Sequence, residues 1–460
     1  MSLPSSTVKH LDLLGLQINS EPLNQRSMFD CVPLNQLAIG VILEDSIGKI
    51  QCIVPADCFI DLRRLNEQYG RDFRATTIAA TCRIANSFGL ASLPSLPHFA
   101  GLECVYASQL PKAEQLYFHP GSDDELVRVP RADFETLLKD STCVDFAQPV
   151  INFQPPSDVA PPSDERNIVA AVENFTSLRI KQRLEATLEI PPMPSTSQRV
   201  IRLRVDPNAG VADLATLVET DPSLAAQVVS WAGSPLYGAP GKVRSVHDAV
   251  IRVLGFDLVI NLALGLSIGK SLSMPADRAD GTLSYWQEAV YSAAITEAIA
   301  KLIPKPIRPQ AGLCYLIGLL HNFGYLILGH VFPPHLALIN RYVEANPHVE
   351  VQVIEQFLLG LTRQQLCAWL LNSWQMPAEL VTAIRWQGDL SYQGEHHIYS
   401  HLSVIVSKLL ANRVNQQPLL NLEQSLKILQ LEYDRIPPAM DAIWDNLSHL
   451  DAMATDLART

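Results

Sequence analysis

The chain has 460 residues, which is too long for one ordinary core, and 48% of them are hydrophobic, so we expect two or three compact domains. Its 47 acidic and 35 basic side chains give a net charge of -12, which disfavours broad electrostatic attraction to nucleic acids or anionic membranes. Eight cysteines occur without a CxxC pair, which predicts reduced thiols and a cytoplasmic location.

The N-terminus and the apolar stretches give no indication of export or membrane insertion. Residues 1–22 lack a basic region followed by an apolar one, so we expect no secretory signal. The stretch 254–268 is interrupted by Asp257 and Asn261. Such stretches are short of a membrane span, and we predict buried core helices instead.

Residues 1–147 mix strand and helix patterns and predict an α+β domain. Two apolar, β-branched runs, LAIGVILED and IQCIVPA, flank the turn-like residues 45–48 and predict a hairpin. GLECVYAS and ELVRVP are further strand candidates. CFIDLRRLNEQYG and RADFETLLKD have helical spacing and end at Gly70 and Asp140.

The rest of the chain predicts a linker followed by helices. Proline, serine and aspartate are concentrated at residues 148–164, and because proline fixes φ and lacks an N–H donor, we expect an extended linker there. We assign residues 165–387 to a helical domain and residues 388–460 to a helical extension. Asp221-Pro222, Ser245 and Thr362 are predicted helix starts.

The extension is predicted to contain helices at residues 397–411 and 438–457. One helical face carries Leu402, Ile405, Val406 and Leu409. We favour a place in the core for this face over a subunit contact. The sequence contains nothing that defines an oligomeric state.

Four segments of the helical region carry a family resemblance: IPPMPSTSQRVIRL, TDPSLAAQVVSWAGSPLYG, SVHDAVIRVLGFDLVINLAL and YLIGLLHNFGYLILG. Their order and content resemble the HDOD family over residues 183–387. The resemblance implies an all-helical fold shared with HD phosphohydrolases and a role in bacterial signalling proteins.

The doublet His321-Asn322 bears on metal chemistry. An HD phosphohydrolase uses an adjacent His-Asp pair to bind a divalent metal, which lowers the pKa of bound water and stabilises charge on phosphate. Here Asn322 replaces the carboxylate with a neutral amide. We therefore predict no metal and no cofactor, with His321 and Asn322 as a degenerate remnant and His321 as a hydrogen-bonded structural residue.

Residues 24–140 resemble the YbaK/prolyl-tRNA editing family, which hydrolyses mischarged aminoacyl-tRNA. The resemblance rests on the hairpin, PADCFIDLRRL and ANSFGLASLPSLPHFAGLECVYAS, in this order. It implies a lysine at the start of the first hairpin strand, where Ala38 stands, and a glycine pair in the loop that here reads 89–94. We expect hydrolysis to be lost, and the weak candidates for ligand binding are Ala38, Gly89, Ser92 and Pro94.

Our leading hypothesis is a non-catalytic regulatory protein. Its HDOD domain would bind a protein partner, and its editing-like domain would bind a ligand or partner. Two enzyme hypotheses stay open: an aminoacyl-tRNA deacylase, for which tRNA is the one expected nucleic acid, and an HD-type metal-dependent phosphohydrolase. Deacylation of mischarged tRNA and metal content distinguish the three.

Overall fold

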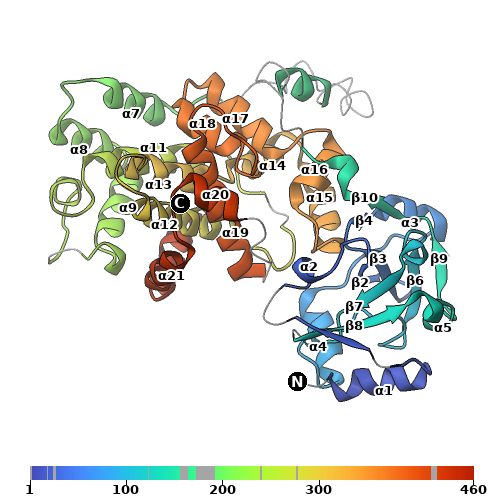
Figure 1. Cartoon of the computed structure of the whole chain (residues 1–460). Coiled ribbons are helices and arrows are strands. Elements are labelled where there is room, and N and C mark those ends of the chain that lie inside the picture. The colour runs from blue at the N-terminus through green and yellow to red at the C-terminus, as the bar shows by residue number, and fades with distance from the viewer. Residues whose placement is uncertain are drawn as a thin grey trace. The chain divides into compact units, whose positions relative to one another are not determined.

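The computed structural model describes residues 3–17, 19–23, 27–122, 124–155, 164–171, 192–238, 241–275, 278–415 and 422–459 (Figure 1). The chain divides into two compact units. Unit 1 combines Met1–Pro155, Asp277–Gly281 and Pro334–Leu359, and unit 2 combines Pro156–Ala276, Thr282–Pro333 and Gly360–Thr460.

Unit 1 is built on a mixed sheet, as the sequence predicts. Within the described residues, the eight-stranded sheet has the order β1-β8-β7-β2-β3-β6-β9, with β5 paired to β2, and a second sheet pairs β10 with β4. The strands are β1 Ser20–Pro22, β2 Leu37–Glu44, β3 Lys49–Pro55, β4 Cys58–Ile60, β5 Arg74–Ala75, β6 Glu103–Ala107, β7 Gln115–Phe118, β8 Glu125–Pro130, β9 Thr142–Val144 and β10 Ala147–Pro149.

The predicted hairpin is confirmed. β2 and β3 pair antiparallel from Ala38 opposite Pro55 to Glu44 opposite Lys49. The Asp45 carboxylate closes the turn, because its Oδ1 accepts from the main-chain N–H groups of Ile47 and Gly48. β6 and β8 confirm the two other predicted strands.

Helices and 3₁₀ turns surround the sheets of unit 1. They are α1 Ser5–Leu13, α2 Met28–Cys31, α3 Leu62–Tyr69, α4 Ile78–Ser87, η1 Leu110–Lys112, η2 Arg131–Asp133, α5 Phe134–Leu137, η3 Val150–Phe153, α15 Pro333–Ala345 and α16 Val351–Leu359. The helix predicted from Cys58 starts later, because the buried Cys58–Ile60 pairs as β4 and Asp61 caps α3. α3 ends at Gly70, which has a left-handed φ of 61°.

The start of the predicted linker is structured. Residues 148 and 149 belong to β10, which pairs with β4, and residues 150–153 form η3. The antiparallel pairing with β4 and the ring contact between Phe153 and Phe59 hold this segment in unit 1 despite its prolines. Residues 156–163 of the predicted linker lie outside the described residues.

The helical domain predicted at residues 165–387 is interrupted in the structure. Residues 334–359, which form nearly all of α15 and all of α16, belong to unit 1. Sequence periodicity marks these residues as helical but does not show which core their apolar faces cover. The helical region is therefore continuous in sequence but divided between two compact units.

Unit 2 is helical throughout the part that the structure describes. Beyond a helix at residues 164–171, its elements are α7 Ser195–Val205, α8 Val211–Glu219, α9 Pro222–Ala232, η5 Pro235–Tyr237, α10 Val246–Asp248, the π-helical η6 Ala249–Leu254, α11 Phe256–Gly269, α12 Tyr285–Leu302, α13 Ala311–Leu320, α14 Phe323–Val331, α17 Arg363–Ser373, α18 Ala378–Arg385, α19 His397–Asn415, α20 Leu422–Ile428, η7 Tyr433–Arg435, α21 Ile436–Trp444 and α22 Leu447–Arg459. α12 and α13 form the centre of this unit and are almost wholly buried.

The predicted helix caps of unit 2 are confirmed. The Asp221 side chain accepts from the main-chain N–H groups of residues 223 and 224, and Pro222 is the first residue of α9. Ser245 caps α10, and Thr362 forms a capping box with Gln365 at the start of α17. Gly255 adopts a φ of 81° where η6 ends and α11 begins.

The C-terminal extension differs from its prediction at one point. The helix expected at residues 438–457 is two helices, α21 and α22, which are separated by Asp445 and Asn446. The apolar face of α19 is buried as favoured, and its four residues, Leu402, Ile405, Val406 and Leu409, are at most 8% exposed.

One stretch of the described chain is long and apolar enough to cross a membrane. It covers Ala311–His330 and contains no Asp, Glu, Lys or Arg, and its 18-residue window has a mean hydropathy of 1.6. This run is longer and less polar than the stretch at 254–268, on which the expectation of short core helices was based. In the structure 78% of that window is buried, and the stretch forms two successive core helices, α13 and α14.

Candidate functional site

Four helices of unit 2, α12, α13, α14 and α17, bring a group of polar side chains together at the end of α13. α12 contributes Glu288, Ser292 and Thr296, which follow one another at intervals of four residues and so share one helical face. His321 directly follows α13, and Asn322 caps α14. Arg363 is the first residue of α17. We call Glu288, His321, Asn322 and Arg363 the polar network.

Two glycines allow this approach. A methyl group on Gly318 would lie 2.5 Å from Ala293 Cα and 2.5 Å from the main-chain oxygen of Ser292. A methyl group on Gly324 would lie 2.3 Å from the main-chain oxygen of Arg363. Because real Cβ atoms do not approach backbone so closely, glycine is required at both positions. At Gly324 the crowding atoms belong to α17.

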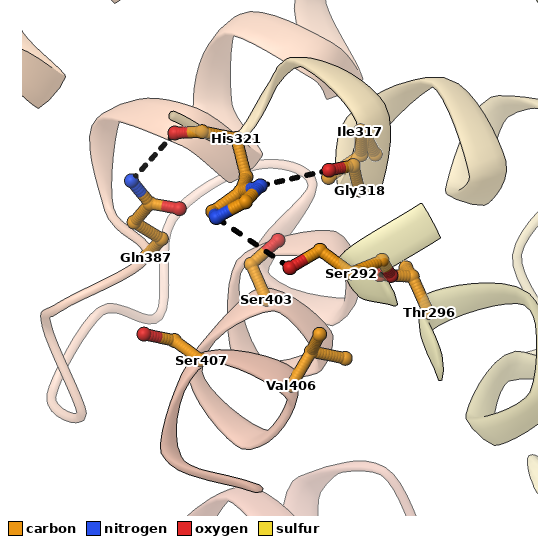
Figure 2. Close-up of a pocket in the computed structure, with 9 residues that line it drawn as sticks. All are labelled: Ser292, Thr296, Ile317, Gly318, His321, Gln387, Ser403, Val406 and Ser407. Atoms are coloured by element: carbon orange, nitrogen blue, oxygen red, sulfur yellow. Dashed lines mark hydrogen bonds between the residues drawn. The ribbon is translucent and has the colours of Figure 1, made fainter. Parts of the chain in front are cut away.

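His321 is held at both ring nitrogens (Figure 2). Nδ1 lies 2.8 Å from the main-chain oxygen of Gly318, so it carries a proton and donates. Nε2 lies 3.3 Å from Glu288 Oε1 and 3.5 Å from Ser292 Oγ. A neutral ring can accept there from the hydroxyl group, and a charged ring can donate to the carboxylate.

A small recess lies beside the imidazole. Its volume is about 10 Å³, which is enough for roughly one water molecule. Figure 2 shows its lining residues, which come from α12, from the end of α13, from the segment that follows α18, and from α19. They are Ser292, Thr296, Ile317, Gly318, His321, Gln387, Ser403, Val406 and Ser407. The Gln387 amide donates to the main-chain oxygen of His321 across 3.0 Å and fixes the end of α13.

Asn322 bridges an anion and a cation. Its Nδ2 donates to Glu288 Oε2 at 2.7 Å, and its Oδ1 accepts from Arg363 Nη1 at 3.2 Å. An amide has both a donor and an acceptor, whereas an ionised carboxylate only accepts. The residue that departs from the HD doublet is therefore the one that joins Glu288 to Arg363.

The charge of Glu288 is compensated within the network. Burial raises the pKa of its carboxyl, but the hydrogen bond and charge of His321, the charge of Arg363 and the Asn322 amide together lower it below the usual range. Its side chain is 31% exposed, and it lies in the first turn of α12, where the helix dipole favours an anion.

The network does not fit a divalent metal. It offers one carboxylate and one imidazole, and within the described residues no three His, Cys, Asp or Glu side chains are grouped as ligands. The Asn322 oxygen already accepts from Arg363, and a guanidinium beside the carboxylate would repel a dication. Arg363 thus supplies the positive charge that faces Glu288.

The N-terminal candidate residues lie on β2 and in the loop after α4. Ala38 is 1% exposed within β2, Gly89 is exposed with a φ of 71°, Ser92 is half-buried and Pro94 is buried. The structure brings the loop onto β2, since a methyl group on Gly40 would lie 3.0 Å from Ser95 Cα.

The loop is packed by its own residues and their neighbours. Ser95 donates its main-chain N–H to the His119 oxygen at 3.0 Å and accepts the His119 N–H through Oγ at 2.8 Å. His10 of α1 lies 2.9 Å from the main-chain oxygen of Pro97. A methyl group on Gly121 would lie 3.0 to 3.2 Å from atoms of residues 90, 92 and 94. These contacts occupy the space beside the loop.

Sequence reasoning missed Glu288 and Arg363. They lie 33 and 42 residues from His321 along the chain, so an argument from adjacent residues does not reach them. The helix starts at Ser284 and Thr362 were the available signal, because each capping box places the following charged residue in the first turn of a helix.

Comparison with known proteins gives a family match within the helical region. The HDOD domain family matches residues 190–390. The crystal structure of a protein from Marinobacter aquaeolei VT8, provisionally named a signal transduction protein, is 39% identical, covers 99% of this chain and 100% of that chain, and has a TM-score of 0.88.

Two further proteins match parts of the chain. An uncharacterized protein from Treponema pallidum (strain Nichols) is 22% identical over 211 residues, so that 45% of this chain spans 39% of that relative's length. A structure provisionally named a trans-editing enzyme for prolyl-tRNA synthetase covers 32% of this chain and 99% of that chain, with 16% identity and a TM-score of 0.28.

Proposed function

Because the chain belongs to the family of HDOD-domain proteins, we propose that it is a non-catalytic regulatory protein of bacterial signal transduction whose HDOD domain binds a protein partner. The observation that carries the proposal is the bridge from Glu288 through Asn322 to Arg363. His321 and Asn322, which stand at the positions of the HD doublet, are both engaged in hydrogen bonds within the polar network. The guanidinium of Arg363 provides the positive charge.

The helical core supports a binding role. The HDOD region keeps its buried helices and the close approach of α12 to α13 at Gly318, although its donor set does not suit metal-dependent hydrolysis. A folded surface can bind a partner without any reactive group. For unit 1 we propose binding of a ligand or partner.

A cytoplasmic location completes the proposal. All eight cysteines are free thiols, five of them buried, which suits a reducing compartment.

Metal content and hydrolysis test the non-catalytic part. We expect the purified full-length protein to hold far less than one metal ion per chain by elemental analysis. We also expect no hydrolysis of phosphomonoesters or cyclic dinucleotides with added Mg²⁺, Mn²⁺ or Zn²⁺. About one tightly held ion per chain, lost in His321→Ala, would return the protein to the enzyme class.

Partner binding needs a separate test. Affinity purification from the source cell should recover the same partners with the wild type and with His321→Ala, once circular dichroism shows that the variant is folded. Deletion of the HDOD region is a poor comparison, because it also removes α15 and α16 from unit 1. Absence of any specific partner, together with turnover of a small metabolite or of mischarged tRNA, would contradict the proposal.

A further inference from the structure

Besides the short segment at residues 277–281, the chain makes one long excursion from unit 2 into unit 1 and back. It leaves unit 2 after Pro333, forms α15 and α16 within unit 1 and returns at Gly360. We call residues 334–359 the excursion. Asn322 lies before its departure and Arg363 lies after its return.

The C-terminal end of α15 is tied to β4 and to the start of α3. Asn346 is fully buried and bonds both main-chain groups of Ile60: its Oδ1 accepts from the N–H at 2.6 Å, and its Nδ2 donates to the oxygen at 3.1 Å. The amide side chain thereby pairs with the main-chain groups of β4 as a neighbouring strand would. The Tyr342 hydroxyl donates to the buried Asp61 carboxylate at 2.8 Å.

α16 is held in unit 1 by aromatic contacts. The ring of Phe357 lies 5.1 Å from that of Phe59 and 4.9 Å from that of Phe153, measured between centroids, and both pairs have edge-to-face geometry. These contacts join the excursion to β4 and to η3. The excursion is therefore packed into unit 1 as an integral part of its structure.

The two ends of the excursion are fastened together in unit 2. The hydrogen bond from Arg363 to Asn322 joins residues 41 positions apart and closes the loop that contains the excursion. At the same place, α14 packs against the first residue of α17 at Gly324. The polar network thus joins the start of α14, eleven residues before the chain leaves for unit 1, to the start of α17, three residues after it returns.

We propose that the excursion couples unit 1 to the polar network, so that loosening β4 and α15 in unit 1 loosens the Asn322–Arg363 bond in unit 2, and the reverse. The route is covalent and short: Gly360, with a φ of 71°, and Leu361 separate α16 from the capping box that positions Arg363. Coupling between two sites is reciprocal by thermodynamic necessity. The coupling would be present whether or not the protein is catalytic.

Hydrogen–deuterium exchange on the full-length protein tests the coupling. Tyr342→Phe removes the hydroxyl that binds Asp61, and Asn346→Ala removes both bonds to Ile60. In either variant we expect exchange to increase about fivefold or more at residues 319–326 and 360–368. A fivefold change corresponds to the lower end of the coupling energies that are usual between two sites. Tyr117→Phe is the matched control, because that hydroxyl accepts from Gln115 within the sheet of unit 1.

The reverse experiment starts in unit 2. Arg363→Gln should increase exchange at residues 57–61 and 342–350 by a similar factor, while circular dichroism shows an unchanged helix content. Exchange at residues 319–326 and 360–368 that stays at the wild-type rate in both Tyr342→Phe and Asn346→Ala would overturn the proposal. An equal increase in the Tyr117→Phe control would overturn it as well, since general loosening would then explain the effect.

Discussion

Asn322→Asp would restore the HD doublet and place two carboxylates side by side. In the wild type the Asn322 amide donates to Glu288 at 2.7 Å, and a hydrogen bond to a charged group contributes about 1.5–3 kcal/mol. The variant loses this donor and adds like-charge repulsion, which a closer ion pair with Arg363 offsets in part. We expect a net loss of about 2–3 kcal/mol in the free energy of unfolding of unit 2 near pH 7.5, which lowers its Tm by roughly 5 °C or more.

The pH dependence of this loss is opposite to that of the wild-type site. Wild-type Glu288 has a lowered pKa, so its stabilisation is complete above the unfolded value of about 4.3 and is lost as the pH falls through the lower folded value. In the variant the two adjacent carboxylates raise a folded pKa. The variant's deficit should therefore be largest at neutral pH and should shrink as the pH falls through that raised pKa toward about 4.

Thermal unfolding followed by circular dichroism or calorimetry, at about pH 7.5, 6 and 5 and constant ionic strength, measures the deficit. Asn446→Asp is the matched control, because the Asn446 amide donates to the main-chain oxygen of Ala442 in α21 and not to a carboxylate. A variant as stable as the wild type at pH 7.5, or a deficit that does not change with pH, would refute the assignment of Asn322 as donor to Glu288.

Three further changes test the packing. Gly318→Ala should cost about 1–3 kcal/mol by overpacking, measured by thermal unfolding, whereas Gly233→Ala, whose nearest new contact is 3.4 Å, should be neutral. Burial lowers the pKa of His348 to about 4, so the unfolded chain binds a proton between about pH 6.5 and 4 that the folded unit 1 does not, and acid destabilises unit 1. On acidification over this range, the Tm of the His348→Gln variant should fall less than the Tm of the wild type. A fragment of residues 1–155 should melt below the full chain, because it lacks α15 and α16; an equal Tm would contradict this.

Local sequence patterns predicted which segments form helices and strands better than they predicted which segments pair or pack with one another. The hairpin at residues 37–55 and the cap at Asp221 depend on turn chemistry and periodicity within a few residues, and both are confirmed. The strand at Cys58–Ile60 was missed because its partner, β10, is almost 90 residues away, and three apolar residues before a helix also fit a helical pattern. Long-range pairing, which local spacing does not encode, decided between the two.

The candidate site shows the same division. The doublet His321-Asn322 is visible in the sequence, and its departure from His-Asp predicts weak metal binding. The reason for asparagine appears only when Glu288 and Arg363 are brought to its two ends. The hydrogen-bonded role expected for His321 agrees with the contacts at Nδ1 and Nε2. Ligand binding at Ala38, Gly89, Ser92 or Pro94 stays a prediction.

The interleaving of the two units affects the order in which the chain can fold during synthesis. Unit 1 begins at the N-terminus but needs residues 334–359, which emerge about 200 residues after Pro155. At roughly 5–20 residues per second, the rest of unit 1 waits about 10–40 s after the synthesis of Pro155 for α15 and α16. Most of the helices of unit 2 up to α14 are made during that interval. Unit 1 is therefore the first to start but stays incomplete until residue 359 has emerged, so its open apolar edge must be protected while the ribosome makes the first helices of unit 2.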